Sequence, residues 1–317
     1  MNYEGLRLIL YVDKFRGFED TYIPLSKVNF FVGENSTGKT SILSIINLLH
    51  NPSFWFKHEF NNDDVKLGFF NEIATKKDSE EYFKVGLFNH VFDSKKNKLN
   101  YWGILLKFFN KKGIPLILEF SYIDSSKEYS VVSKIAKNGN SVQYKLVNQD
   151  FSNMVPLEIF KKWILTVNSE IEKSGFNIIK LHKDLPRSFP VIKSFIDANI
   201  KEKENKMNKS GFGAVFEGFW ELRSVGNLCW IAPIRAKPKR TYDSYDIGIS
   251  SEGEHAPYLL KKMLSARKSE SKKEALDLIN TFGIESRLFD SIDIKNYGTS
   301  YLSPFEIEVK LEESFFK

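Results

Sequence analysis

The feature that most constrains this chain is a short glycine-containing loop between two apolar runs. The pattern G-x-x-x-x-G-K-[ST] is filled without a gap by Gly33, Gly38, Lys39 and Thr40. Before it, residues 28–32 (VNFFV) form a continuous run of β-favouring side chains, typical of a strand buried on both faces. After it, apolar residues recur at helical spacing, which predicts a mostly buried helix. Strand, loop and helix are the context in which this pattern binds phosphate groups.

Each position of the loop has a physical reason. Glycine at positions 33 and 38 lets the backbone turn tightly and bring its N–H groups to the phosphates, at the positive end of the following helix. We expect Lys39 to reach the β- and γ-phosphates of ATP, and the Thr40 hydroxyl to ligate Mg²⁺. The predicted nucleotide contacts are Gly33, Glu34, Asn35, Ser36, Thr37, Gly38, Lys39, Thr40 and Ser41. The alternative is an ordinary glycine-containing turn with a solvated lysine.

Composition limits the class of protein and its surroundings. The 317 residues, 42% of them hydrophobic, are enough for a sizeable core. The formal charge of +6 fits a nucleic-acid partner without requiring one, because a Lys-rich solvated surface gives the same excess. The single cysteine, Cys229, excludes a disulfide framework, so we expect a reducing, cytoplasmic setting. Neither a signal segment nor an apolar run of membrane-spanning length occurs, so we expect no membrane association.

The residues before the loop narrow the class. Residues 6–25 predict two strands joined around Arg16, a hairpin ahead of the loop strand. This hairpin, its Phe-[RK]-Gly-Phe turn and the following VNFFVGENSTGKTSIL resemble the ABC-type ATPases of the SMC and RecF kind. Glu34 and Asn35 match the variant of their loop that begins Gly-Glu-Asn, whereas Ser36 stands where glycine is usual. If that position has a positive φ, serine costs about 1 kcal/mol there.

The resemblance implies an α/β fold, an ABC-type P-loop ATPase head with a mixed sheet, an antiparallel β layer and a helical insertion. It also implies that Arg16 lies near the nucleotide. We expect an N-terminal ATPase lobe over residues 1–154, a helical insertion over 155–227, and a return to the ATPase core over 228–317.

The rest of the sequence pattern agrees with these boundaries. Residues 82–148 contain five β-rich segments, with a hairpin signal at Asn138-Gly139 between the last two. Residues 155–223 predict helices interrupted by a charged run at 201–209, which is either a solvated face or a nucleic-acid contact. Residues 228–264 predict a short buried strand, a basic loop, and a helix entered near Glu254. The basic loop contains Arg235, Lys237, Lys239 and Arg240.

A second resemblance rests on this later region. Ala-Pro-Ile-Arg at 232–235, Pro-x-Arg-x-Tyr at 238–242 and Gly-Glu-x-Ala-x-x-Leu at 253–259 look like the middle segment of prokaryotic ABC ATPases of the OLD and PtuA type. Residues 66–77 also resemble that group. Its members serve in anti-phage defence, including the Septu and retron-associated systems. The resemblance implies a homodimer or higher oligomer and a separate effector nuclease of the HNH type.

Hydrolysis in these families needs an apolar Walker B strand ending in Asp-Glu and a signature loop before it, and no segment here qualifies. Glu119 follows an apolar run but lacks the aspartate, so we interpret it as a sheet residue. The signature-like stretch at 210–213 is followed by no Walker B strand. The catalytic residues therefore stay unassigned, and the chain looks like an ATPase head lacking its C-terminal lobe. The five histidines are scattered without metal-ligand spacing, so a nuclease would be a separate subunit.

Three functions remain open from the sequence. The leading one is an ATP-binding sensor or regulator in anti-phage defence, in which ATP-dependent pairing of two heads gates an effector. The second is a DNA-repair head of the RecF or RecN kind that binds duplex DNA, which the basic loop favours. The third is a nucleotide-binding structural subunit that never hydrolyses ATP.

Overall fold

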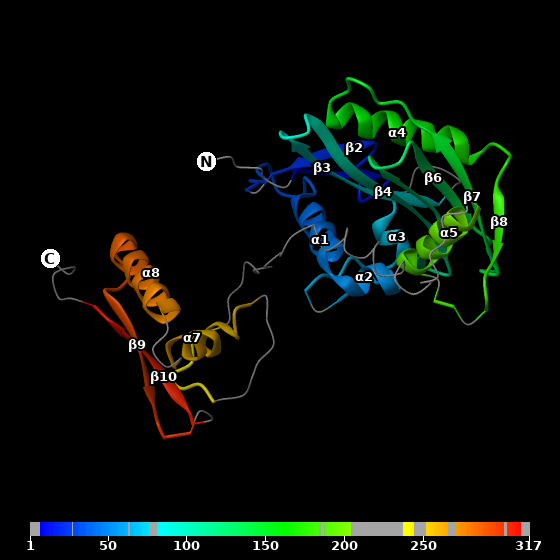
Figure 1. Cartoon of the computed structure of the whole chain (residues 1–317). Helices are drawn as coiled ribbons and strands as arrows, with labels where there is room; N and C mark the ends of the chain where they lie inside the picture. Colours follow the sequence, from blue (N-terminus) through cyan, green and yellow to red (C-terminus); the bar gives the residue numbers. More distant parts are fainter. Residues whose placement is uncertain are drawn as a thin grey trace. The chain divides into compact units, whose positions relative to one another are not determined.

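The chain divides into two compact units, residues 1–228 and 229–317 (Figure 1). The computed structural model describes residues 7–26, 28–62, 64–75, 81–183, 185–186, 188–203, 237–243, 252–265, 270–300 and 303–311. None of the described helices is long and apolar enough to cross a membrane.

The first unit is built on one antiparallel sheet of eight strands in the order β2-β1-β3-β4-β5-β6-β7-β8. The strands are β1 (Arg7–Asp13), β2 (Thr21–Leu25), β3 (Tyr82–Asp93), β4 (Lys98–Lys111), β5 (Ile114–Asp124), β6 (Tyr129–Ile135), β7 (Ser141–Asn148) and β8 (Asn177–Lys180). Every strand pair is antiparallel, and β4 and β5 change register between Lys107 and Phe108. The predicted N-terminal hairpin and the predicted sheet over residues 82–148 are both confirmed.

Helices cover both faces of this sheet, because alternate strand residues are apolar on each side. Leu8, Leu10 and Val12 of β1 belong to one core, and Ile9 and Tyr11 belong to the other. Figure 1 shows one helix, α4, on one side of the sheet and the remaining helices of the unit on the other. The helices are α1 (Lys39–His50), α2 (Pro52–Lys57), α3 (Phe70–Ile73), α4 (Pro156–Ile171) and α5 (Phe189–Lys203). The helix predicted after the loop and the first two helices predicted in the insertion are confirmed.

The strand predicted at residues 28–32 is wrong. This segment belongs to neither a strand nor a helix, and Val28, Phe30 and Val32 are 69, 86 and 88% exposed. Phe31 packs partly against the core. A buried strand needs a neighbouring strand to satisfy its backbone, and none of the described strands pairs with this segment. The segment has the composition of a buried strand, but among the described residues it has no strand partner, and Phe31 is its one side chain that packs against the core.

The described residues of the second unit contain two helices and a two-stranded antiparallel sheet. These are α7 (Ala256–Ser265), α8 (Glu270–Ser286), β9 (Ser291–Asn296) and β10 (Phe305–Lys310). Phe305 is fully buried, with the rings of Tyr242 and Tyr258 centred 5.5 and 5.7 Å from its own. The helix predicted near Glu254 is confirmed as α7. The strand at 228–234, Arg235, the stretch at 210–213 and the last predicted helix of the insertion lie outside the described residues.

Candidate nucleotide-binding site

The loop of residues 33–38 leads directly into α1 and depends on glycine at its end. Gly38 lies in the left-handed region with a φ of 87°, immediately before the first residue of α1. A Cβ added at Gly38 would lie 2.6 Å from ring carbons of Phe18 in the turn between β1 and β2. Position 38 therefore requires glycine for its backbone angle and for its contact with this turn.

Ser36 is also in the left-handed region, with a φ of 65°. The sequence predicted that serine would be strained if this position needed a positive φ, and the structure confirms that it does. A left-handed residue with a Cβ costs about 1–2 kcal/mol relative to its favoured conformations. The loop thus carries backbone strain at a position where the resembling families have glycine.

The Lys39 ammonium lies over the loop backbone. It donates to the carbonyl oxygen of Gly33 at 2.8 Å and to that of Glu34, and it lies 3.4 Å from the Thr37 hydroxyl. The Thr37 hydroxyl in turn donates to the Glu34 carbonyl at 2.9 Å. A lysine held in this way places a positive charge inside the loop, where a phosphate oxygen can replace neutral carbonyls as its acceptor.

The N-terminus of α1 points an uncompensated positive dipole at the loop. The helix is 12 residues long, its first turn contains no acidic residue, and no side chain caps its N-terminal N–H groups. Such a terminus binds anions, because free N–H groups and the macrodipole act together. Thr40 is exposed in the first turn, where its hydroxyl is accessible to a metal ion bound with the phosphates. These residues fit Mg-ATP.

Three of the other predicted contacts lie on the same loop. Glu34, Asn35 and Thr37 are exposed, so their backbone and side chains are accessible to a ligand. Ser41 is half-buried in the first turn of α1. The structure thus brings the predicted loop residues together around Lys39, and their contact with nucleotide stays a prediction.

Arg16 lies in the same turn as Phe18 but has other partners. Its guanidinium donates to the carbonyl oxygens of Leu67 at 3.0 Å and Glu72 at 3.3 Å, and its backbone N–H donates to Ile73 at 2.8 Å. These bonds join the turn to the segment around α3. Direct contact between Arg16 and nucleotide stays a prediction, and the observed role of the side chain is to hold the turn in place.

Two further observations concern catalysis. Glu119 lies in β5 with its carboxylate 3.1 Å from the Lys107 ammonium of β4, which confirms its interpretation as a sheet residue. Among the described residues, no group of three or more His, Cys, Asp or Glu side chains is placed to hold a metal ion.

Phe18, which fixes the position of Gly38, was missed as a site residue, although the repeated phenylalanine of the FRGF turn was a signal for it.

The fold and the loop together define a P-loop nucleoside triphosphatase domain. Comparison with protein-family models matches residues 10–221 to the AAA ATPase domain family. The match covers more than half of the chain and spans the hairpin, the P-loop and the eight-stranded sheet, so the chain belongs to this family. Nucleotide binding by the chain follows from that membership. A comparison with curated protein sequences gives no match.

Proposed function

We propose that this chain is the ATP-binding subunit of an ABC-type ATPase of the OLD and PtuA group, acting as a sensor or regulator in anti-phage defence. ATP binding is supported by the AAA ATPase domain match and by the position of the Lys39 ammonium over the loop at the α1 N-terminus. The defence role is supported by the sequence resemblance at residues 66–77 and 232–259. The observation that carries the proposal is the geometry of the loop.

The residues of the loop have separate roles in this proposal. When bound, Mg-ATP supplies a polyanion and a divalent cation at the exposed loop. Lys39 exchanges its carbonyl acceptors for phosphate oxygens, and the free N–H groups of α1 bind the same phosphates. Thr40 offers its hydroxyl to Mg²⁺.

The exposed residues of the loop support the proposed pairing of two heads. Glu34, Asn35, Ser36 and Thr37 are exposed, so a γ-phosphate bound here can also contact a second subunit. Val28, Phe30 and Val32 add an exposed apolar surface next to the loop, and surfaces of this kind are common at protein interfaces. A second head that contacts the γ-phosphate binds the ATP state more tightly than the free state, and this difference shifts the equilibrium toward pairs. A separate effector nuclease would respond to that shift.

The mass of the protein in solution tests the pairing. We expect wild-type protein to form pairs with a slowly hydrolysed ATP analogue and Mg²⁺, and to dissociate without nucleotide. The Lys39→Ala variant should keep the lower mass under both conditions. Native mass spectrometry of complexes tagged in their own host tests the effector, and an HNH-type nuclease subunit is expected. An unchanged mass with and without the analogue would refute ATP-dependent pairing.

A DNA-repair head remains the second candidate because of one feature in the second unit. Lys237, Lys239 and Arg240 lie on an exposed loop, and the only partner seen for the Arg240 guanidinium among the described residues is Glu306 at 3.8 Å. Phosphate contacts release counterions, so duplex binding through this loop would weaken steeply with salt. Steeply salt-dependent binding of duplex DNA would favour this candidate over the defence role.

A further inference from the structure

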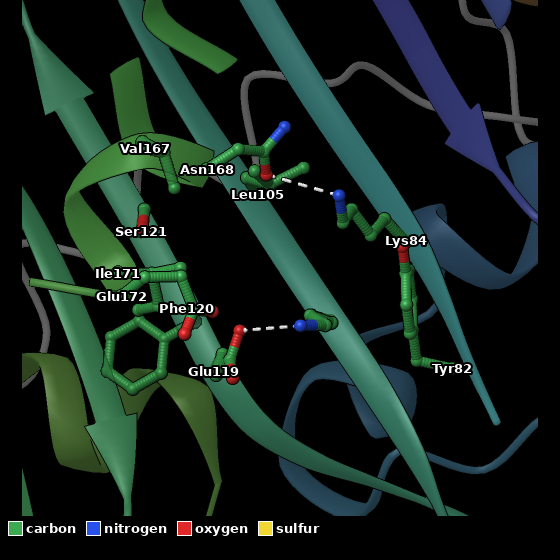
Figure 2. A pocket seen from close by; sticks show the side chains of 11 residues that line it. Tyr82, Lys84, Leu105, Glu119, Phe120, Ser121, Val167, Asn168, Ile171 and Glu172 are labelled. Carbon is green, nitrogen blue, oxygen red and sulfur yellow. Dashed lines mark hydrogen bonds and ion pairs between the residues drawn. The ribbon is translucent and has the colours of Figure 1, made fainter. Parts of the chain in front are cut away.

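A cavity of about 310 Å³ lies between the sheet and the C-terminal half of α4 (Figure 2). Strands β3, β4 and β5 form its floor, and α4 forms its wall. Its polar lining includes Tyr82, Lys84, Lys107, Glu119 and Asn168. The core on this face of the sheet includes α4, whereas α1 packs in the core of the opposite face. The cavity is therefore separate from the P-loop.

Lys84 is a charged side chain in an otherwise apolar part of β3. It stands between the buried Phe83 and Val85 and is itself only 8% exposed. Its ammonium donates to the Asn168 amide oxygen at 3.1 Å and lies 3.5 Å from the Asp13 carboxylate. An ammonium has three N–H donors, so these two partners leave capacity for a third acceptor. A buried charge with a loose ion pair gains much from a further anionic partner.

Lys107 brings a second ammonium to the same place. The Lys84 and Lys107 nitrogens lie 5.3 and 4.5 Å from the centre of the Tyr82 ring. Both ammoniums therefore lie around one aromatic side chain in the lining of the same cavity. The carboxylates of Asp13 and Glu119 pair with these two lysines. Lys14, 4.2 Å from the same ring centre, and Glu172 in the cavity lining add one formal charge of each sign.

Part of the remaining cavity wall is apolar. Leu105 of β4 and Val167 and Ile171 of α4 line it, and each is at most 5% exposed. A purely inorganic ion would make no favourable contact with these apolar side chains. Small-molecule sites commonly combine such apolar walls with a few convergent polar groups.

We propose that this cavity binds a small organic anion. Its acidic group, a carboxylate or a phosphate, lies between the Lys84 and Lys107 ammoniums, and its apolar portion lies against Leu105, Val167 and Ile171. This site is additional to the nucleotide site and does not depend on the function proposed above.

The charge state of Lys84 gives the proposal a pH dependence. Burial lowers the pKa of the Lys84 ammonium, as does Lys107, whereas Asp13 and Glu119 oppose the shift. Glu172 of the adjoining turn also lines the cavity. A bound anion favours the charged lysine and raises its pKa, so anion binding is strongest below that pKa and weakens as the pH rises through it.

Calorimetric titration of the full chain tests the site. The Lys39→Ala variant serves as the parent protein, because it removes the P-loop lysine as a competing anion site. The probes are phenyl phosphate, phenylacetate and inorganic phosphate. We expect saturable binding of one phenyl compound below about 10 mM, weakened about 10- to 100-fold by Lys84→Met. Lys107→Gln is the second variant, since it changes a more accessible lysine and should weaken binding in the same direction.

Lys145→Met is the matched control. Lys145 also pairs with a carboxylate of α4, Glu170, at 2.6 Å, but it does not line the cavity. The comparison of phenyl phosphate with phenylacetate identifies the acidic group. Equal affinity for phenyl phosphate and inorganic phosphate would overturn the apolar half of the proposal. Absence of saturable binding by all three probes, or binding unchanged in both lysine variants, would overturn the site itself.

Discussion

At the scale of single residues, the conformation of the P-loop depends on positive φ at positions 36 and 38 as well as at Gly33. Gly38 adopts its angle without a Cβ and leaves room for the Phe18 ring, whereas Ser36 adopts a φ of 65° with a side chain in place. The P-loop pattern identified position 38, and the resemblance to the SMC and RecF kind of ATPase identified position 36. The sequence could not say that the backbone of this chain keeps the glycine-like angle at Ser36, because that angle depends on how the loop closes onto α1.

Replacing Ser36 by glycine should therefore stabilise the fold. Relief of the left-handed strain exceeds the entropy that glycine gains in the unfolded chain, so we expect the free energy of unfolding to rise by about 0.5–1 kcal/mol. Urea denaturation measures this free energy of unfolding. Ser169→Gly is the control, because Ser169 is exposed within α4 and glycine in a helix should lower stability by about 0.5–1 kcal/mol. A loss of stability in Ser36→Gly would show that the strain is absent.

At the scale of elements, the sequence predicted the helices and strands whose signal lies in a local pattern of residues. Alternation identified the strands of the sheet, and helical spacing identified α1, α4, α5 and α7, since both signals lie within one segment. The strand prediction at 28–32 was wrong because burial of that segment depends on a neighbouring strand, which no local sequence pattern reveals. The short elements α2, α3 and β8 were missed because they contain too few residues to show a period.

At the C-terminal end of α2, the buried side chain of His58 predicts that the stability of the fold falls in acid. The His58 Nε2 atom is buried with no hydrogen-bond partner among the described residues, and its ring lies 6.4 Å from that of Phe108 in β4. Burial lowers the pKa of His58 from 6.5 to about 4. Because the unfolded chain takes up the proton first, His58 contributes full stability above pH 6.5, and this contribution is lost as the pH falls toward 4.

Protonation of His58 should lower the free energy of unfolding by up to about 1.4 kcal/mol per pH unit in that window. The measurement is urea denaturation of the wild type and His58→Asn from pH 7 to pH 4. Asparagine tolerates the left-handed backbone that His58 adopts, with a φ of 56°, and does not titrate. Parallel pH profiles for the two proteins would contradict a shifted histidine pKa.

At the scale of the whole molecule, residues 28–32 expose apolar side chains next to the P-loop, and the proposed pairing of two heads would cover them. Phe30 is 86% exposed, so its replacement removes little from the isolated fold. We expect Phe30→Ser to change the free energy of unfolding by no more than about 0.5 kcal/mol and to weaken ATP-dependent pairing. Sedimentation with and without the ATP analogue measures the pairing. Undiminished pairing would show that this surface is not part of the interface.

The most direct test of the account is a titration of the full chain with Mg-ATP. The wild type should bind, and Lys39→Ala should bind about 10- to 100-fold more weakly, because it loses charge-assisted bonds to the phosphates. Lys57→Ala, which removes an exposed lysine at the end of α2, should bind as the wild type does. Equal affinity of the wild type and Lys39→Ala would contradict the assignment of this loop as the nucleotide site.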